Sequence, residues 1–521
     1  MKQCSRLAAV LLCVIFLGAS VAQALDKDTF VIIKYAEVIS LDPQDTTDTP
    51  SEDLNNKIHE GLVTLDQDLK VVPALATEWS MSEDGMAWTF KLREGVKYHS
   101  GTPFNAEAVK VNFDRILNGQ YKRTSLYAPA IKDVQVLDEY TVVFNLKEPF
   151  GPFLNILAHP AGLILDPSYV KDPEKNANIK RSPSGTGPFA FEEWEPGDYV
   201  SLTAFKDYWQ GEPKIKRVLF KVAPEQASRG MIAEAGDAHV VQQLGAPDAE
   251  RLREHKELDI VSLPGLSVYF LVLNVTDSIL SDVKVRTALA YAIDRDGISN
   301  NILKGLALPA YTVISPVVNA YNGEGFTIPY DVEKAKALLE ESGWKDDGTG
   351  VRKKDGKPLS LELWTSSQGS PLPEAYQGFA RAIGMDIKIQ VMDWATINSR
   401  IQVPPEQAKA QIIMIGWSPS TADADWAYRP LLHSSMFPPT GSNYCYYKDD
   451  DVDKNIIIGM QTADIAVRKE AYRKIDEAVL RDFPRIPVYI AKTAYAVRKE
   501  VKNITISPLN YVNVNHLTYV E

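Results

Sequence analysis

The chain has 521 residues, and its 56 lysine and arginine residues against 68 aspartate and glutamate residues give a net charge of −12. An acidic surface of this kind argues against a nucleic-acid partner. The length exceeds one compact core several-fold, so at least two domains are expected. The composition is that of an ordinary globular protein and shows no low-complexity tract.

Residues 1–24 have the pattern of a secretory signal peptide. Lys2 and Arg6 supply a basic start, and the apolar stretch from Leu7 to Leu17 is too short to span a bilayer. Ala22-Gln23-Ala24 then offers small residues at the cleavage positions. Cleavage removes two basic and no acidic residues, which takes the net charge to −14. We therefore expect a mature chain that starts near residue 25.

The cysteines support export without a lipid anchor. Cys13 lies inside the apolar stretch rather than after small residues, so a lipoprotein is not expected. Cys4 and Cys13 leave with the signal peptide, and the mature chain keeps only Cys445. An internal disulfide is therefore impossible, which is compatible with an oxidising compartment. We expect an exported protein without a lipid anchor.

The first half of the mature chain predicts antiparallel strands. Apolar residues alternate with polar ones over 88–93 and again over 142–146, as in strands that are buried on one face. Gly185-Thr186-Gly187-Pro188-Phe189 lacks the glycine spacing and the Lys-Ser/Thr of a phosphate loop, so a turn or domain crossover is expected there.

The second half predicts alternating helices and strands. Helical periodicity covers 283–298 and also 332–339, a helix that Asp331 should cap and Gly343 should end. A strand at 359–363, a helix at 373–383 and a strand at 387–391 form a βαβ unit, hence a parallel pair. The apolar run 412–415 suits one further buried strand.

In open α/β sheets ligands bind beyond the carboxyl ends of the strands. The residues at those ends are Trp364-Thr365, Asp393-Trp394 and Gly416-Trp417-Ser418, which together predict a cleft lined by tryptophan. Asp423, Asp425, Trp426 and Arg429 supply nearby polar groups. Two alternatives stay open: Asp425 caps a helix over 426–432, and Arg429 forms a solvated ion pair.

No catalytic or metal-binding set emerges from the sequence. Gly416-Trp417-Ser418-Pro419-Ser420 begins like a nucleophile elbow but ends in serine instead of glycine. The seven histidines stand apart from one another and from any cysteine partner. The acidic run 449–453 lacks the glycine and terminal glutamate of a calcium loop. We therefore expect no cofactor, no metal and no enzymatic activity.

Several segments resemble the peptide-type extracytoplasmic solute-binding proteins of ABC importers. The similarity covers almost the whole mature chain in order, in the segments 40–43, 73–79, 88–109, 185–189, 273–275, 286–295 and 486–489. The resemblance implies an α/β fold: a two-lobed periplasmic binding protein of the large, three-domain type, with an additional inserted domain and a hinge-closing cleft. The implied division is signal peptide 1–24; lobe I 25–58, 186–275 and 490–521; inserted domain 59–185; lobe II 276–489.

Within that family, residues 416–431 most resemble the glutathione-binding branch, which reads Gly-Trp-Ser, a small-residue run, an acid, then Ala-Asp-Trp-Ala and Arg-Pro. Dipeptide and oligopeptide binders usually carry an aspartate where this chain has Ser420. Dipeptide binders also tend to carry an arginine in the loop that here reads 366–370 as Ser-Ser-Gln-Gly-Ser. Both departures argue against a plain dipeptide assignment.

The resemblance implies a periplasmic receptor that captures a small peptide, glutathione or a di- or tripeptide, and delivers it to permease subunits in the inner membrane. Asp423 or Asp425 could meet the ligand ammonium, and Arg429 could hold its carboxylate. The facing lobe offers Tyr35, Glu37 and Ser40, just after the first mature strand. The protein is expected to act as a monomer.

Three alternatives stay open from the sequence. Relatives that carry other solutes keep an opine or a nickel chelate possible, and His433 lies near the cleft motif. A secreted hydrolase or peptidase is the alternative of another class, although no nucleophile, base and orienting group come together in the sequence.

Overall fold

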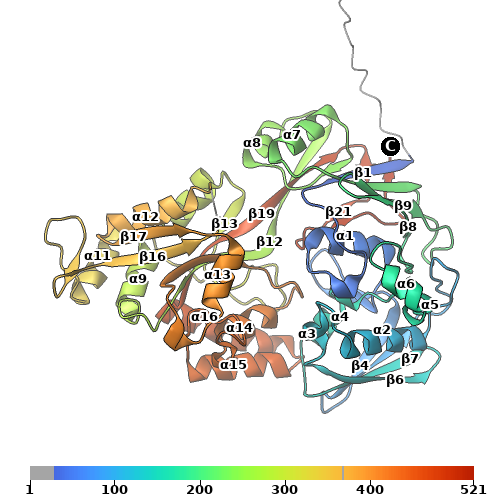
Figure 1. Ribbon diagram of the computed structural model, residues 1–521, viewed down its shortest axis with the longest axis horizontal. Coiled ribbons are helices and arrows are strands. Elements are labelled where there is room, and N and C mark those ends of the chain that lie inside the picture. Colours follow the sequence, from blue (N-terminus) through green and yellow to red (C-terminus); the bar gives the residue numbers. More distant parts are fainter. Residues whose placement is uncertain (1–27, 367–368) are drawn as a thin grey trace, which may run out of the picture.

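The computed structural model of the protein describes residues 28–366 and 369–521, so the predicted signal peptide lies outside the described residues. Two lobes lie side by side and are joined by two long strands, β12 (Leu258–Leu273) and β19 (Arg485–Arg498), as Figure 1 shows. The two strands pair antiparallel, and their register shifts between Pro264 and Val268. Irregularities of this kind bend a strand. A bent two-strand connection is therefore built into the fold.

One large sheet runs through both lobes. The strand order is β17-β16-β18-β12-β19-β11-β1-β10-β9-β8, with β13 paired to β19 beside this path. Besides β12 and β19, the strands of this sheet are β1 (Thr29–Lys34), β8 (Phe189–Glu195), β9 (Tyr199–Ala204), β10 (Arg217–Val222), β11 (Val240–Val241), β13 (Ala307–Pro309), β16 (Ser360–Thr365), β17 (Asp386–Val391) and β18 (Ile412–Trp417).

The first lobe is built on the β1 side of this sheet. Parallel pairing of β1 with β10 and β11 places buried Phe30 and Ile32 in its core. Its helices are α1 (Thr49–Ile58), α7 (Gln226–Ala235) and α8 (Ala246–Arg251). Short strands near the C-terminus complete it: β20 (Val501–Lys502), β21 (Thr505–Ile506), β22 (Val512–Asn513) and β23 (Tyr519–Val520). Asp48 begins α1, because its side chain accepts a hydrogen bond from the backbone N–H of Ser51 at 2.9 Å.

A separate unit, which we call the insert, follows α1 in the chain. Its antiparallel sheet has the order β4-β5-β7-β6, and α2 packs against β6 and β7. The predicted alternation over 88–93 and 142–146 is confirmed, since Trp88, Phe90 and Val142 point into its core. Its strands are β2 (Val63–Leu65), β3 (Val71–Pro73), β4 (Ala76–Met81), β5 (Ala87–Leu92), β6 (Ile131–Asp138) and β7 (Thr141–Leu146). Its helices are α2 (Ala106–Asn118), α3 (Thr124–Tyr127), α4 (Phe153–Leu157), α5 (Pro167–Lys171) and α6 (Pro173–Asn178).

The second lobe contains the predicted βαβ unit. Strands β16 and β17 pair in parallel, and α12 (Leu372–Ala382) connects them, so this prediction is confirmed. The prediction for α11 (Val332–Glu341) is also confirmed: the Asp331 side chain accepts from the Lys334 N–H at 2.8 Å, and Gly343 follows with a left-handed φ of 85°. Its other elements are α13 (Trp394–Ile401), α14 (Asp425–Leu432), α15 (Asp450–Gln461), α16 (Ile465–Asp482), β14 (Lys353–Lys354) and β15 (Lys357–Pro358).

The helix predicted over 283–298 is wrong at its end. Helix α9 (Val283–Ala292) stops at Ala292, and Ile293 is extended. Asp294 then accepts a hydrogen bond from the Gly297 N–H at 2.7 Å and begins a new short helix, α10 (Arg295–Gly297). A helix cap therefore interrupts an apolar periodicity that continues across it. In the part of the chain that the structure describes, no helix is long and apolar enough to cross a membrane.

Candidate functional site

In the second lobe, the end of β18 pairs with a strand on one edge only among the described residues. β12 pairs with β18 along Ile412–Trp417, whereas β16 pairs only with Ile412 and Ile413. The segment 414–417 therefore has no strand partner on its second edge among the described residues. An unpaired edge can take up the backbone of an extended peptide.

Gly416 is required at this edge by an aromatic pair on the neighbouring strand. Tyr269 is its cross-strand partner, and a Cβ at Gly416 would lie 2.8 Å from the Tyr269 ring. That ring stacks on Tyr489 at 4.6 Å between centroids. The Gly416-Trp417-Ser418 motif thus lies beside β12, one of the two strands that join the lobes, and Gly416 lies against the Tyr269 ring.

Trp417 and Ser418 continue this edge into the next loop. The Trp417 indole Nε1–H donates to the Trp426 carbonyl at 2.7 Å, which links β18 to α14, and the Ser418 residue is exposed. Trp417 is partly buried against the core of the second lobe, whereas Trp426 packs against the core of the insert. The two tryptophans therefore connect this loop to the core of the second lobe and to the core of the insert.

Asp423 is fully buried and already has partners. Arg468 donates to both carboxylate oxygens, and the Asn319 amide donates to Oδ2 at 3.1 Å. Oδ1 also accepts from the backbone N–H of Asp425 at 2.9 Å. Burial lowers the pKa of Arg468, but the Asp423 carboxylate outweighs it and raises that pKa well above its usual value. Asp423 therefore organises the loop that contains it.

Asp425 and Arg429 form an ion pair within α14. The Arg429 Nη2 donates to Asp425 Oδ2 at 2.6 Å, and its Nε donates to Oδ1 at 3.0 Å. The Asp425 side chain is 2% exposed and that of Arg429 is 22% exposed, so the pair is largely buried and not solvated. Asp425 is the first residue of the helix and does not cap it, because Ala424 occupies the N-cap position. The capping interpretation of Asp425 is wrong.

The tryptophans at the strand ends do not form one wall. Trp364 is 6% exposed and belongs to the core cluster against which Trp417 packs. Trp394 is 43% exposed and begins α13, whose cap is the neighbouring Asp393. Thr365 is fully buried. The strand-end rule located these residues correctly, since β17, β16 and β18 are neighbours in the sheet, but the side chains of Trp364 and Trp394 differ in burial and do not face one cleft together.

A shallow hollow lies beside Trp364. It has a volume of about 710 Å³ and is lined by Trp364, Arg400, Val403, Gln407 and Lys409. The Arg400 guanidinium lies 5.9 Å from the centre of the Trp364 ring.

In the first lobe the three predicted residues have different surroundings. Tyr35 is half-buried and hydrogen-bonds to Thr49 and Gln243, and burial raises its pKa. Ser40 is buried, and its hydroxyl accepts from the Asp42 N–H at 3.1 Å. Glu37 is exposed and lines a small pocket against the turn between β8 and β9. Of the three residues, Tyr35 is the one that places its hydroxyl between α1 and the loop after β11.

Sequence reasoning missed a buried charged network under α1. Asp53 accepts from Lys34 Nζ and Lys57 Nζ, both at 2.6 Å, and all three side chains are at most 2% exposed. Its neighbour Glu52 pairs with Arg123 and accepts from Tyr511 Oη at 3.1 Å. Most partners are far apart in sequence, so no spacing signal marks the network; only the Asp53–Lys57 pair has helical spacing.

A cavity of about 430 Å³ lies at the C-terminal end of α1, where Lys57, His59 and Glu60 line it with residues of the insert. Burial raises the pKa of Glu60 to about 7, although Tyr208 and Trp209 donate hydrogen bonds to it. Burial also lowers the pKa of His59 to about 3. This end of α1 therefore carries a neutral histidine and a carboxyl that titrates near neutrality.

The described residues contain no group of three histidine, cysteine, aspartate or glutamate side chains arranged to hold a metal ion. His433 caps a short turn instead, since its Nδ1 accepts from the Ser435 N–H at 3.1 Å. The histidine near the cleft motif thus has a local structural role in this structure.

Comparisons with known proteins agree on one family. The sequence model of the family described as "Bacterial extracellular solute-binding proteins, family 5 Middle" matches residues 70–438. The glutathione-binding protein GsiB of Salmonella typhimurium is 32% identical over 501 residues, which cover 94% of this chain and 95% of the relative.

Solved structures of the same family superpose over nearly the full length. The oligopeptide-binding protein AppA of Bacillus subtilis, in complex with a nonapeptide, has a TM-score of 0.74 at 27% identity and covers 95% of this chain and 99% of its own. NikA of Brucella suis, in complex with Fe(III)-EDTA, has a TM-score of 0.84 at 25% identity and covers 95% of this chain and 100% of its own. The two-lobed fold with an inserted domain is therefore confirmed.

Proposed function

The chain belongs to the bacterial extracellular solute-binding proteins of family 5, and from that premise we propose that it is the periplasmic binding component of an ABC importer. It captures a small peptide, glutathione or a di- or tripeptide, and delivers it to permease subunits in the inner membrane. The observation that carries this proposal is the unpaired backbone edge of 414–417, which ends in the Gly416-Trp417-Ser418 motif.

The ligand contacts that we propose differ from a simple ammonium–aspartate pair. Asp423 is fully engaged by Arg468 and Asn319, so we assign it to support of the loop. Asp425 engages Nε and Nη2 of Arg429, which leaves Nη1 to receive a ligand carboxylate. The backbone edge and the exposed Ser418 hydroxyl hold the peptide groups. Tyr35 approaches from the first lobe.

The rest of the proposal follows from the family and the leader sequence. The protein returns its ligand chemically unchanged, works as a monomer, and is released into the periplasm after cleavage near residue 25, without a lipid anchor. The lobe and insert boundaries given above serve as its working domain division. An opine or a nickel chelate is the alternative cargo within the same family, and the structure of NikA with Fe(III)-EDTA supports the chelate.

A panel of ligands tests the proposal directly. Thermal unfolding of the mature chain is measured with reduced glutathione, dipeptides, tripeptides, an opine and nickel–histidine. We expect a raised midpoint with a peptide ligand. Hydrogen exchange of residues 414–418 should then slow at saturating ligand, because the new backbone hydrogen bonds protect the edge. A shift with only the opine or the chelate, or unchanged exchange at 414–418, would contradict the peptide assignment.

A further inference from the structure

A glycine of the insert lies directly against the second lobe. The Gly151 N–H donates to the Met460 carbonyl at 2.7 Å, in the last turn of α15. A Cβ at Gly151 would lie 1.7 Å from the Thr462 carbonyl oxygen, far inside the closest contact that real Cβ atoms make. Its backbone φ is outside the left-handed region. Glycine is therefore needed at 151 for the approach of the other lobe and not for its own conformation.

An asparagine of the insert forms a second polar contact. Asn155 in α4 is 4% exposed, and its amide donates to the Thr421 carbonyl at 3.3 Å. Its Oδ1 accepts from Asn319, whose amide also donates to Asp423. The insert is thus hydrogen-bonded to the loop that directly follows Trp417 and Ser418.

Apolar contacts close the same junction. Met460 of α15 is 7% exposed and belongs to the core cluster of the insert, with Trp426 and Ile457 packed against it. In the other direction, Leu69 of the turn between β2 and β3 is 2% exposed within the core cluster of the second lobe. Figure 1 shows α14 and α15 beside α3 and α4 at the end of the molecule opposite the connecting strands. The lobes therefore touch at both ends.

We propose that this junction, which we call the seam and define by Gly151, Asn155, Thr421 and Met460, is a latch that sets how much of the protein has its lobes closed. Gly151 and Asn155 are positioning residues: they act on ligand affinity through lobe closure and not by touching ligand. The inference rests on the proposed function, because a binding site formed between lobes is complete only when they meet. Apparent affinity then falls in proportion to the closed fraction.

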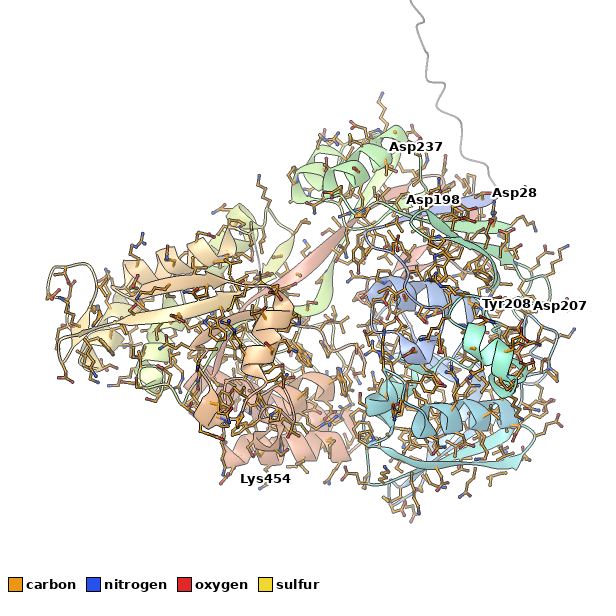
Figure 2. The ribbon with its side chains drawn as sticks, in the orientation of Figure 1. Asp28, Asp198, Asp207, Tyr208, Asp237 and Lys454 are labelled. Carbon is orange, nitrogen blue, oxygen red and sulfur yellow. The ribbon has the colours of Figure 1, made fainter. Side chains whose placement is uncertain are left out.

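The seam is tested first without ligand, by a distance across the lobes. Asp207 of the first lobe and Lys454 of the second lobe are both exposed and lie at the right edge and at the bottom of the view in Figure 2, so cysteines at these two positions can carry spin labels. Cys445 is fully buried and stays unlabelled. In a Gly151→Ala background we expect the label-to-label distances to lengthen relative to the native seam. An unchanged distance distribution would overturn the proposal.

Two further variants separate the seam from a general loss of structure. Gly378→Ala is the matched control, because a Cβ there meets nothing within 4 Å and its φ is ordinary; it should leave the distances as they are. Asn155→Ala removes the Thr421 contact without a clash and should lengthen the distances in the same direction, with a smaller shift. If Gly151→Ala and Gly378→Ala change the distances equally, the seam is not a latch.

A titration with reduced glutathione then links the seam to affinity. If Gly151→Ala lowers the closed fraction tenfold, we expect it to raise the Kd for glutathione by about tenfold. Most of this change should be a faster dissociation rate. A shift in distance, with no binding of glutathione or of any di- or tripeptide by the native protein or a variant, would contradict the proposed function and support the latch. Normal glutathione binding with the native Kd in Gly151→Ala would contradict the latch and support the proposed function.

Discussion

Arg468 donates two hydrogen bonds to Asp423, from Nη1 to Oδ2 at 2.9 Å and from Nη2 to Oδ1 at 2.5 Å, across 45 positions of sequence. Both side chains are at most 3% exposed. The Asn319 amide donates a hydrogen bond to the same carboxylate and another to Oδ1 of Asn155 in the insert. Asp423, which the sequence suggested as a partner for a ligand ammonium, is thus part of a hydrogen-bond network that connects its own loop to the insert.

Loss of Arg468 should strongly destabilise the protein, because it leaves the buried Asp423 carboxylate without its positive partner. We expect Arg468→Met to lower the free energy of unfolding by about 3–5 kcal/mol, measured by urea denaturation. The double variant Asp423→Leu/Arg468→Met removes both charges and should recover much of that loss. A single variant within about 1 kcal/mol of the native protein would show that the pair does not hold the loop.

Arg429 should discriminate between ligands by their carboxylate. Arg429→Lys keeps a positive charge, but one ammonium cannot pair with Asp425 as Nε and Nη2 do and also offer a separate N–H to the ligand carboxylate. We therefore expect roughly tenfold weaker binding of reduced glutathione in calorimetric titration. Glutathione ethyl ester, which is esterified at the glycine end, lacks the glycine carboxylate. Its affinity should be the same for the native protein and for Arg429→Lys. Equal weakening of acid and ester would place the carboxylate elsewhere.

Buried histidines should make the fold sensitive to acid. Burial lowers the pKa of His59 to about 3 and those of His99 and His239 to about 4. A group whose folded pKa is depressed in this way takes up a proton on unfolding, so its contribution to stability is complete above about pH 6.5 and is lost as pH falls toward the folded value. His59→Leu should therefore reduce the slope of unfolding free energy against pH by about 1.4 kcal/mol per pH unit between pH 6 and 4.

Two buried carboxyls change the unfolding free energy with pH in the opposite direction to the histidines. The test is therefore the difference between the pH curves of His59→Leu and the native protein, and not the native curve alone. Burial raises the pKa of Glu60 and of Asp476 to about 7, so each stabilising contribution is complete below about pH 4.5 and is lost as pH rises to 7. Both groups remain in His59→Leu and cancel in the comparison. Identical slopes in the two proteins would mean that His59 is protonated in the folded state.

The sequence predicted elements that depend on local patterns. Alternation marked β5 and β7, and the cap at Asp331 marked α11, because these signals lie within a few residues of the structure they cause. The break after Ala292 escaped prediction, since apolar spacing continues across the new cap at Asp294. Local rules therefore located elements more reliably than their ends.

The site was less predictable because its partners are distant in sequence. The motif 416–418 was found at a strand end, but the pairing of Asp423 with Arg468 depends on how α16 packs against the loop. Arg123 and Glu52 are 71 positions apart and give no spacing signal. Gly151 carries no motif, and only the distance to Thr462 reveals why a glycine stands there.

Native mass spectrometry of the mature protein with reduced glutathione and a set of di- and tripeptides tests the central claim most directly. We predict that each chain binds one ligand, that the ligand keeps its intact mass after release, and that occupancy falls in Arg429→Lys. No adduct with any of these peptides, or release of cleaved products, would contradict the assignment of this chain as a peptide-binding component of an importer.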